Sequence, residues 1–282
     1  MQLEHSIADS FRRPNQPINV LVVGAGGNGS AIFLHLPYLH QALRVWGHAG
    51  LNVTLVDGDE VSETNCVRQP FASADVGLNK AVVLANRVNL FWGLRWRAVP
   101  EHFRRDFLDD SRDQTHLLIS CVDTRAARQM IAGAVTSNRN STAYWLDLGN
   151  NAASGQYVLG QPRNWRNAQK GDRLRTVVEL YPDIAALEIG EDPLPSCSAL
   201  EALERQEPFI NQVLATSALA MLSRLLRCGT ISHHGAFFNA TTGRMSIMPI
   251  DRDLWRKTQR RSLRLLKRSI ARPRISATAA VA

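Results

Sequence analysis

A buried strand that runs straight into a glycine-rich turn and a helix is the feature that most constrains this chain. Residues 18–23 read INVLVV, GAGGNGS follows at 24–30, and a helical stretch begins at Ala31. A continuous apolar run rich in β-branched residues is typical of a parallel strand buried on both faces. The order of strand, glycine turn and helix therefore predicts an α/β fold whose helix N-terminus can bind a phosphate.

The glycines of this turn have distinct expected roles. Gly24 permits the tight turn, Gly26 lets a phosphate approach the backbone, and Gly29 lets helix and strand pack closely. Gly27 lies between the last two and belongs to the same candidate phosphate loop. The alternative is a turn that serves only the packing of a sheet protein.

A second apolar strand, Leu51–Val56, ends at Asp57. An acidic residue at the tip of the second strand commonly binds a ribose hydroxyl. Asp57 follows Gly24 by 33 residues, where about 20 is usual, so we expect an inserted helix extension or turn around residues 37–50. At this point ATP and NAD remain equally compatible with the sequence.

The segment after Asp57 favours ATP over NAD as the expected nucleotide. It reads DGDEVSETNCVRQPF at 57–71 and DVGLNKA at 75–81. Arg68 can bind phosphate oxygens with two parallel hydrogen bonds, Lys80 adds a point charge, and Asn65 donates without adding charge. A triphosphate requires such groups, whereas a nicotinamide dinucleotide does not. The alternative is a solvated loop with scattered charges.

This order of residues resembles the ThiF/MoeB/ubiquitin-activating superfamily, whose motif reads roughly D-x-D-x-V-x-x-x-N-x-x-R-Q-x-F followed by D-x-G-x-x-K. The resemblance implies a Rossmann-like parallel sheet with flanking helices, continued by antiparallel strands and a closing hairpin. It also implies ATP and Mg²⁺ as cofactors and includes Asp59 in the nucleotide site.

A third apolar strand, His116–Cys121, is followed by Val122 and Asp123. A carboxylate at the carboxyl end of a parallel strand points into the ligand crevice. The resemblance implies that Asp123 holds the magnesium, and one carboxylate with phosphates and water is enough for Mg²⁺. The alternative is that Asp123 caps a helix.

The second half of the chain contains two further strands and a possible acceptor thiol. Residues 144–149 and 155–160 read as strands, and the polar residues 161–175 read as a loop or flexible crossover. Cys197 precedes a helix from Ala199, where a thiolate gains from the helix dipole. The resemblance implies that Cys197 can accept the activated carboxyl, although some relatives carry such a cysteine without needing it. The sequence lacks C-x-x-C pairs, so we expect no structural zinc.

The chain divides into an arm (1–17), an adenylation domain (18–250, with a crossover at about 161–198) and a basic tail (251–282). The domain closes with a hairpin around Gly243, beside the adjacent His233 and His234, to which we assign a structural role. All of the net charge of +8 lies in the tail. Leucines and bases alternate there at near-helical spacing, which fits an arm lying on the body, a nucleic-acid-binding segment or a membrane-surface helix.

Composition limits the remaining classes. Hydrophobic residues make up 45% and charged residues 21%, and the sequence contains no apolar run as long as a membrane span, about 20 residues. The start of the chain lacks the pattern of a signal peptide, and the four cysteines are widely spaced. We therefore expect a reduced, cytoplasmic protein.

The expected function is adenylation of the C-terminal carboxylate of a small ubiquitin-like (β-grasp) protein. An inserted stretch precedes Asp57, D-L-G-N lies near Asp147, and residues 195–211 read PSCSALEALERQEPFIN. In these features residues 18–250 resemble the ThiF-related protein of plasmid PRTRC cassettes, and the resemblance implies such a partner. Relatives also take an arginine from the N-terminal helix of a dimer mate, so Arg12 or Arg13 in a homodimer can serve. The alternatives are a non-catalytic adaptor, an NAD-dependent oxidoreductase, and adenylation of a small molecule or an RNA-borne carboxylate.

Overall fold

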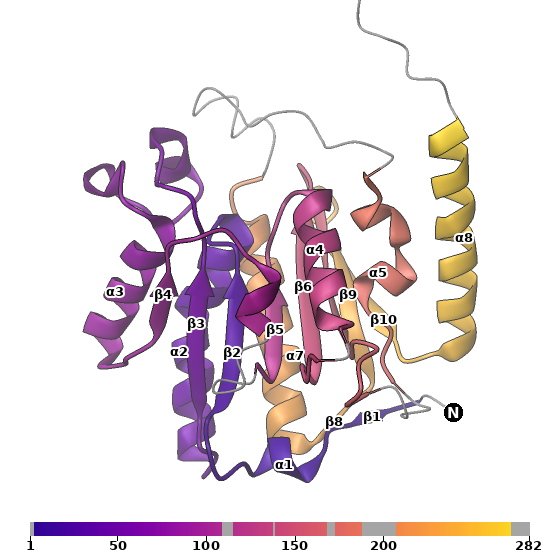
Figure 1. Cartoon of the computed structure of the whole chain (residues 1–282), viewed down its shortest axis with the longest axis horizontal. Helices are drawn as coiled ribbons and strands as arrows, with labels where there is room; N and C mark the ends of the chain where they lie inside the picture. The colour runs from indigo at the N-terminus through magenta and orange to yellow at the C-terminus, as the bar shows by residue number, and fades with distance from the viewer. Residues whose placement is uncertain (1–2, 109–114, 138, 168–172, 188–206, 272–282) are drawn as a thin grey trace, which may run out of the picture.

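The computed structural model describes residues 3–108, 115–137, 139–167, 173–187 and 207–271. An eight-stranded sheet forms its centre (Figure 1). Its strands are β2 (Ile18–Val23), β3 (Leu51–Val56), β4 (Arg97–Val99), β5 (Leu117–Ser120), β6 (Tyr144–Asn150), β7 (Ser154–Gly160), β9 (His233–Asn239) and β10 (Arg244–Pro249). A separate two-stranded sheet pairs β1 (His5–Ser6) with β8 (Thr230–Ile231).

The sheet has a parallel half and an antiparallel half. Its strand order is β10-β9-β7-β6-β5-β2-β3-β4. The five strands from β6 to β4 in this order are parallel, whereas β6, β7, β9 and β10 pair antiparallel in sequence. The expected parallel sheet, continued by antiparallel strands and a closing hairpin, is confirmed.

Helices cover both faces of this sheet. They are α1 (Asp9–Arg12), α2 (Gly27–Val45), α3 (Lys80–Trp92), α4 (Arg125–Val135), α5 (Val177–Leu180), α7 (Ile210–Cys228) and α8 (Arg252–Ala271). Short 3₁₀ turns are η1 (Glu63–Val67), η2 (Ser73–Asp75), η3 (Arg105–Leu108) and η4 (Pro182–Ala185). In Figure 1, α4 crosses the near face of the sheet, while α7 lies behind the strands and packs against α2.

The long spacing between Gly24 and Asp57 comes from α2. This helix continues for 19 residues, with Pro37 buried inside it. A turn with positive φ at Gly47 (81°) and Gly50 (90°) then leads into β3. The insertion is therefore an extended helix followed by a tight turn, and both expected forms are present together.

The polar segment after β7 is irregular, and its described part packs against the body through buried side chains. Asn164 and Asn167 are almost fully buried, and each donates its side-chain amide to the carbonyl of Thr142. Arg173 forms a two-pronged ion pair with Glu179 at 2.5 and 2.8 Å. These side chains replace the backbone ladder that a loop lacks.

Both ends of the described chain pack against the body of the protein. His5 of β1 forms a 2.8 Å hydrogen bond with the hydroxyl of Tyr144, and the Phe11 ring meets that tyrosine edge-on. At the other end, α8 packs against α5 and η4. None of the described helices combines the length and apolar character that crossing a membrane requires.

Candidate functional site

The register of the parallel strands brings the predicted motifs to one edge. Val23 lies opposite Val56 in β3 and opposite Ser120 in β5. Gly24 and Asp57 follow directly after the first two of these residues. The carboxyl ends of β2, β3 and β5 therefore form a single edge, where ligands bind in open α/β sheets.

Two glycines of the turn at 24–30 lie so close to backbone atoms that a Cβ does not fit, and a Cβ at Gly27 would lie 2.3 Å from the Nδ2 of Asn211. Gly24 has a φ of +94°, and an added Cβ would lie 2.8 Å from the carbonyl oxygen of Cys121. A Cβ at Gly29 would lie only 1.8 Å from the carbonyl oxygen of Gly24. The turn thus closes tightly on itself and on β5, which agrees with the roles expected for both residues.

Gly26 differs because its surroundings are open. A Cβ there would meet no atom within 4 Å, and its φ of −69° is one that any residue adopts. As N-cap of α2, Gly26 also leaves the first turn without a side-chain cap. Packing therefore does not require this glycine, and the first turn of α2 can be approached by an anion.

Asp57 holds the turn in place. Its Oδ2 accepts a hydrogen bond from the N–H of Ala25 at 2.5 Å, and its Oδ1 accepts one from the N–H of Asp59 at 2.8 Å. Burial raises the pKa of the Asp57 carboxyl, and these two N–H groups act in the opposite direction. Each oxygen retains a lone pair, so the carboxylate can still accept from a ribose hydroxyl.

Lys80 lies beside this aspartate at the start of α3. Its Nζ is 3.3 Å from Oδ2 of Asp59, and its side chain is only 10% exposed. Asn79 caps the helix through the N–H of Val82 and donates its amide to the carbonyl of Asp57. The structure therefore brings the predicted residues Asp57, Asp59 and Lys80 together.

Asn65 and Arg68 lie on and just after η1. The Oδ1 of Asn65 accepts a 3.0 Å hydrogen bond from the N–H of Ser62, which leaves its amide Nδ2 as the donor on offer. Arg68 is half-buried, and burial lowers the pKa of its guanidinium. A partly desolvated cation interacts more strongly with an anion than one in bulk water.

Asp123 is exposed at the carboxyl end of β5 and does not cap α4. The cap is Thr124, whose Oγ1 accepts from the N–H of Ala127 at 3.2 Å. The structure therefore excludes the alternative that Asp123 is a capping residue. Cys197 lies outside the described residues, so the structure gives no account of it.

Comparison with known proteins agrees with this geometry. The ThiF family model matches residues 15–250. The chain belongs to the ThiF family. A comparison with curated protein sequences found no match.

Solved structures similar to this ThiF-family chain share its fold at low identity. PaaA matches with a TM-score of 0.54 and 14% identity, over 85% of this chain and 65% of PaaA. E. coli MccB with ATP gives 0.52 and 16%, over 86% and 65%. E. coli MccB with AMPCPP and MccA gives 0.56 and 16%, over 86% and 66%. The chain thus spans slightly less than two thirds of these relatives.

A buried ion pair between α4 and β6 of this ThiF-family chain was not among the candidates from sequence. The Nε of Arg128 in α4 is 3.5 Å from Oδ1 of Asp147 in β6, and both side chains are nearly inaccessible. Asp147 also accepts from the hydroxyl of Ser120, which in turn accepts from the indole of Trp145. Burial raises the pKa of Asp147, and Arg128 opposes this. Arg128 follows Cys121 and Asp123 in the spacing C-x-D-x-x-x-x-R, and an arginine at this distance from the predicted Asp123 is the signal that could have identified it.

A second polar contact joins α2 to β6 behind the glycine turn. The Nδ2 of Asn28 donates to Oδ1 of Asn150 at 2.8 Å. The Oδ1 of Asn28 has no hydrogen-bond partner among the described residues, although the residue is only 7% exposed. A buried acceptor without a donor marks a place where a ligand or water is expected.

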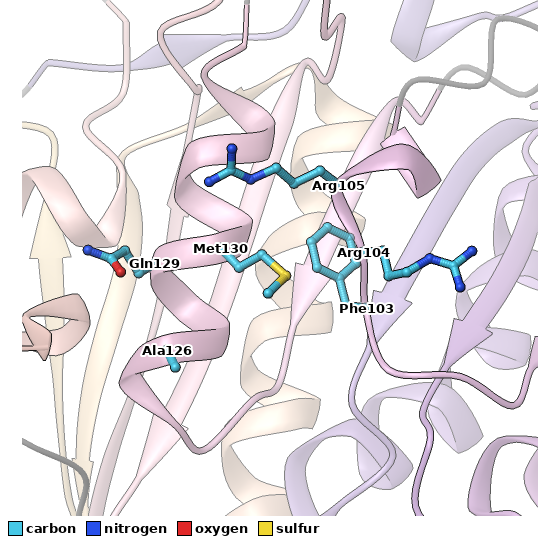
Figure 2. A pocket seen from close by; sticks show the side chains of 6 residues that line it. All are labelled: Phe103, Arg104, Arg105, Ala126, Gln129 and Met130. Carbon is cyan, nitrogen blue, oxygen red and sulfur yellow. The ribbon is translucent and has the colours of Figure 1, made fainter.

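Two cavities are lined by none of the residues predicted for the nucleotide edge. One of about 470 Å³ lies between α4 and the segment before η3, and Figure 2 shows its lining of Phe103, Arg104, Arg105, Ala126, Gln129 and Met130. The other, of about 670 Å³, includes Arg12 and Arg13 beside Trp46 and Gly47, at the far end of α2. Since α2 has 19 residues, these arginines lie about 28 Å from the glycine turn of their own chain.

Proposed function

We propose that this chain binds ATP at the turn 24–30 and adenylates a substrate carboxylate. The observation that carries the proposal is Gly26, where an added Cβ would meet no atom within 4 Å, at the N-terminus of α2 that has no side-chain cap. Asp57 accepts from the N–H of Ala25, the residue before Gly26, and Lys80 contacts Asp59. The family assignment agrees. PaaA and MccB share the fold, and MccB has been crystallised with ATP.

In this proposal Gly24, Gly26, Gly27 and Gly29 surround the phosphates, and Asp57 accepts from the ribose. Lys80 exchanges part of its contact with Asp59 for a phosphate oxygen. The Nδ2 of Asn65 and the guanidinium of Arg68 donate to the α-phosphate. These donors stabilise the charge that develops as pyrophosphate leaves, so positioning and electrostatics supply the catalysis.

The chemistry needs no general base. An oxygen of the acceptor carboxylate, which is already ionised, attacks the α-phosphorus. The bond from that phosphorus to its bridging oxygen breaks, and pyrophosphate carries the electron pair away. The products are an acyl-adenylate and pyrophosphate.

Asp123 is the residue we assign to Mg²⁺. Its carboxylate is exposed at the carboxyl end of β5 and has no capping role. Among the described residues, no three His, Cys, Asp or Glu side chains gather into a metal site. The remaining ligands would be phosphate oxygens and water, which suits Mg²⁺. When bound there, the ion neutralises phosphate charge.

The finer assignments are part of the same proposal. The acceptor is the C-terminal carboxylate of a ubiquitin-like β-grasp protein. The thiolate of Cys197 then attacks the acyl carbon, which releases AMP and forms a thioester. Arg12 or Arg13 of a second copy would complete the site in a homodimer. MccB has been crystallised with MccA, which is an example of the fold with a second molecule bound.

ATP–pyrophosphate exchange tests the proposal directly. We expect exchange that requires Mg²⁺ and a β-grasp protein with an intact C-terminus. Asn65→Asp is the sharpest variant, because it keeps the acceptor for the N–H of Ser62 and replaces the amide donor with an anionic oxygen that repels the phosphates. It should abolish exchange, whereas Asn52→Ala, at the opposite end of β3, should not.

Two results would contradict the proposal. Calorimetry without ATP binding would exclude the nucleotide site itself. ATP binding without exchange, over a panel of protein and small-molecule carboxylates, would favour the non-catalytic adaptor. Loss of a thiol-sensitive adduct in Cys197→Ala, with exchange retained, would support the transfer step separately.

A further inference from the structure

One side of helix α8 packs against the body of the protein. The residues on that side follow helical spacing from Trp255 through Thr258 and Ser262 to Leu266, and the first and third are buried. The indole of Trp255 donates to His234 at 3.0 Å, and the hydroxyl of Ser262 donates to Asp183 at 2.6 Å. Figure 1 shows the helix standing along the edge of the molecule beside α5.

The opposite side of α8 is cationic. Eight bases on this helix are all exposed: Arg252, Arg256, Lys257, Arg260, Arg261, Arg264, Lys267 and Arg268. At 3.6 residues per turn, Arg260, Arg264 and Lys267 lie about 120–180° around the helix axis from Trp255, on the side that faces away from the body. The one acidic residue of α8, Asp253, pairs with Arg256 at 3.2 Å. The outward side therefore carries a large excess of positive charge.

The exposed apolar residues of α8 do not lie within this cationic side. Leu254 and Leu265 border the packed side along one edge, and Leu263 and Ile270 border it along the other edge. A helix that binds a membrane surface inserts its apolar side between lipids. In α8 that side is occupied by α5 and η4, so the side left for a partner favours a polyanion over a membrane.

The type of polyanion follows from the side chains on offer. Single-stranded nucleic acids are bound by aromatic rings on which bases stack. The only aromatic residue of α8 is Trp255, which is 6% exposed and bonded to His234. Arginine and lysine alone suit the regularly spaced phosphates of a duplex. With 20 residues, α8 is about 30 Å long and can follow several phosphates.

We propose that the outward side of α8 binds the phosphate backbone of double-stranded nucleic acid without reading its sequence. Binding of this kind releases the cations condensed on the duplex, so it weakens as salt rises. It adds a second ligand to the protein, on a helix separate from the nucleotide edge, and it does not depend on adenylation.

The test uses the full chain and two labelled DNA duplexes of unrelated sequence, each about 20 base pairs, longer than α8. Anisotropy titrations between about 50 and 200 mM salt give the affinity and its salt dependence. We expect equal affinity for both sequences. The triple variant Arg260→Gln, Arg264→Gln and Lys267→Gln should bind at least about tenfold more weakly, with a shallower salt slope by roughly 3.

A matched control removes the same charge elsewhere. Arg95→Gln, Arg163→Gln and Arg244→Gln change three exposed arginines outside α8 and should leave DNA affinity unchanged. An equal loss in this control would overturn the proposal, because net charge and not α8 would then explain binding. Circular dichroism of both variants establishes that α8 and the body remain folded.

Two further outcomes would also overturn the proposal. One is tighter binding to single strands than to duplexes. The other is tighter binding to phosphatidylserine vesicles than to DNA, which would assign α8 to a membrane surface.

Discussion

The indole Nε1 of Trp255 donates a 3.0 Å hydrogen bond to Nε2 of His234, whose Nδ1 donates to the carbonyl of Leu159 at 2.8 Å. This arrangement fixes a neutral imidazole that joins α8 to β9 and β7. Burial lowers the pKa of His234 to about 4, and the nearby His5 and His233 contribute in the same direction. Protonation of this imidazole therefore opposes the contact that holds α8 against the sheet.

We predict that acid weakens the fold through His234. Its pKa is lower in the folded chain than the ordinary 6.5, so as the pH falls the unfolded chain takes up a proton first. The stabilisation is fully present above about pH 6.5 and is lost towards about pH 4, on the order of 3 kcal/mol. Urea unfolding across this range measures it.

His234→Gln provides the comparison, because glutamine does not titrate here. This variant should lose most of the pH dependence, and the remainder comes from other histidines with lowered pKa, such as His48 and His116. The exposed His102→Gln should behave like the wild type. Identical pH profiles for the wild type and His234→Gln would contradict the prediction.

Two glycine variants should separate folding from nucleotide binding. Gly29→Ala places a Cβ 1.8 Å from the Gly24 carbonyl and should lower the free energy of unfolding by about 2 kcal/mol or more. Gly26→Ala meets no atom and should change that energy by less than about 0.5 kcal/mol, but it should weaken ATP binding at least tenfold. Thermal unfolding and calorimetry measure the two effects. Unchanged ATP affinity in Gly26→Ala would remove the main support for a phosphate on α2.

The charge of Lys80 should matter for chemistry more than for stability. Its partner Asp59 is 58% exposed, and such pairs contribute about 0–1 kcal/mol. Lys80→Met should therefore keep its unfolding energy within about 1 kcal/mol while exchange falls about a hundredfold. Asp59→Asn breaks the same pair but retains the ammonium, so exchange should fall far less. Equal losses in the two variants would instead assign the effect to the ion pair.

The buried pair of Arg128 and Asp147, unlike the pair of Lys80 and Asp59, should contribute strongly to the free energy of unfolding. Arg128→Met leaves a buried carboxylate without its cation and should cost about 3–5 kcal/mol. Adding Asp147→Asn should recover part of this loss, because the uncompensated charge is then gone. Arg139→Met, at an exposed arginine, is the control. A double variant as unstable as the sum of its single variants would show that the two residues do not interact.

The parallel half of the fold could be predicted because its information is local. Ile18–Val23 matches β2 residue for residue, since a strand buried on both faces needs an unbroken apolar run. The glycine turn and Asp57 follow strands that end in register, so their meeting at one edge follows from topology. Gly24 and Gly29 could be assigned roles for the same reason.

Other features depend on contacts between distant segments. Arg128 and Asp147 are ordinary charged residues until α4 is laid over β6. Asn164 and Asn167 suggest an exposed loop by composition, yet their amides satisfy carbonyls more than twenty residues away. The sequence alone could not show which side of α8 packs against the body, because several leucines lie around the helix. The packed side is set mainly by Trp255, which donates to His234.

The place of the N-terminal arm has a kinetic consequence. Arg12 borders Gly229 and lies at the end of α2 opposite the glycine turn, and β1 keeps the arm attached to β8. An arginine from this arm can therefore reach a glycine turn only in another copy of the chain. If adenylation uses that arginine, its rate per molecule will fall on dilution, and mixing Arg12→Ala with a Lys80→Met partner will restore activity that neither variant has alone.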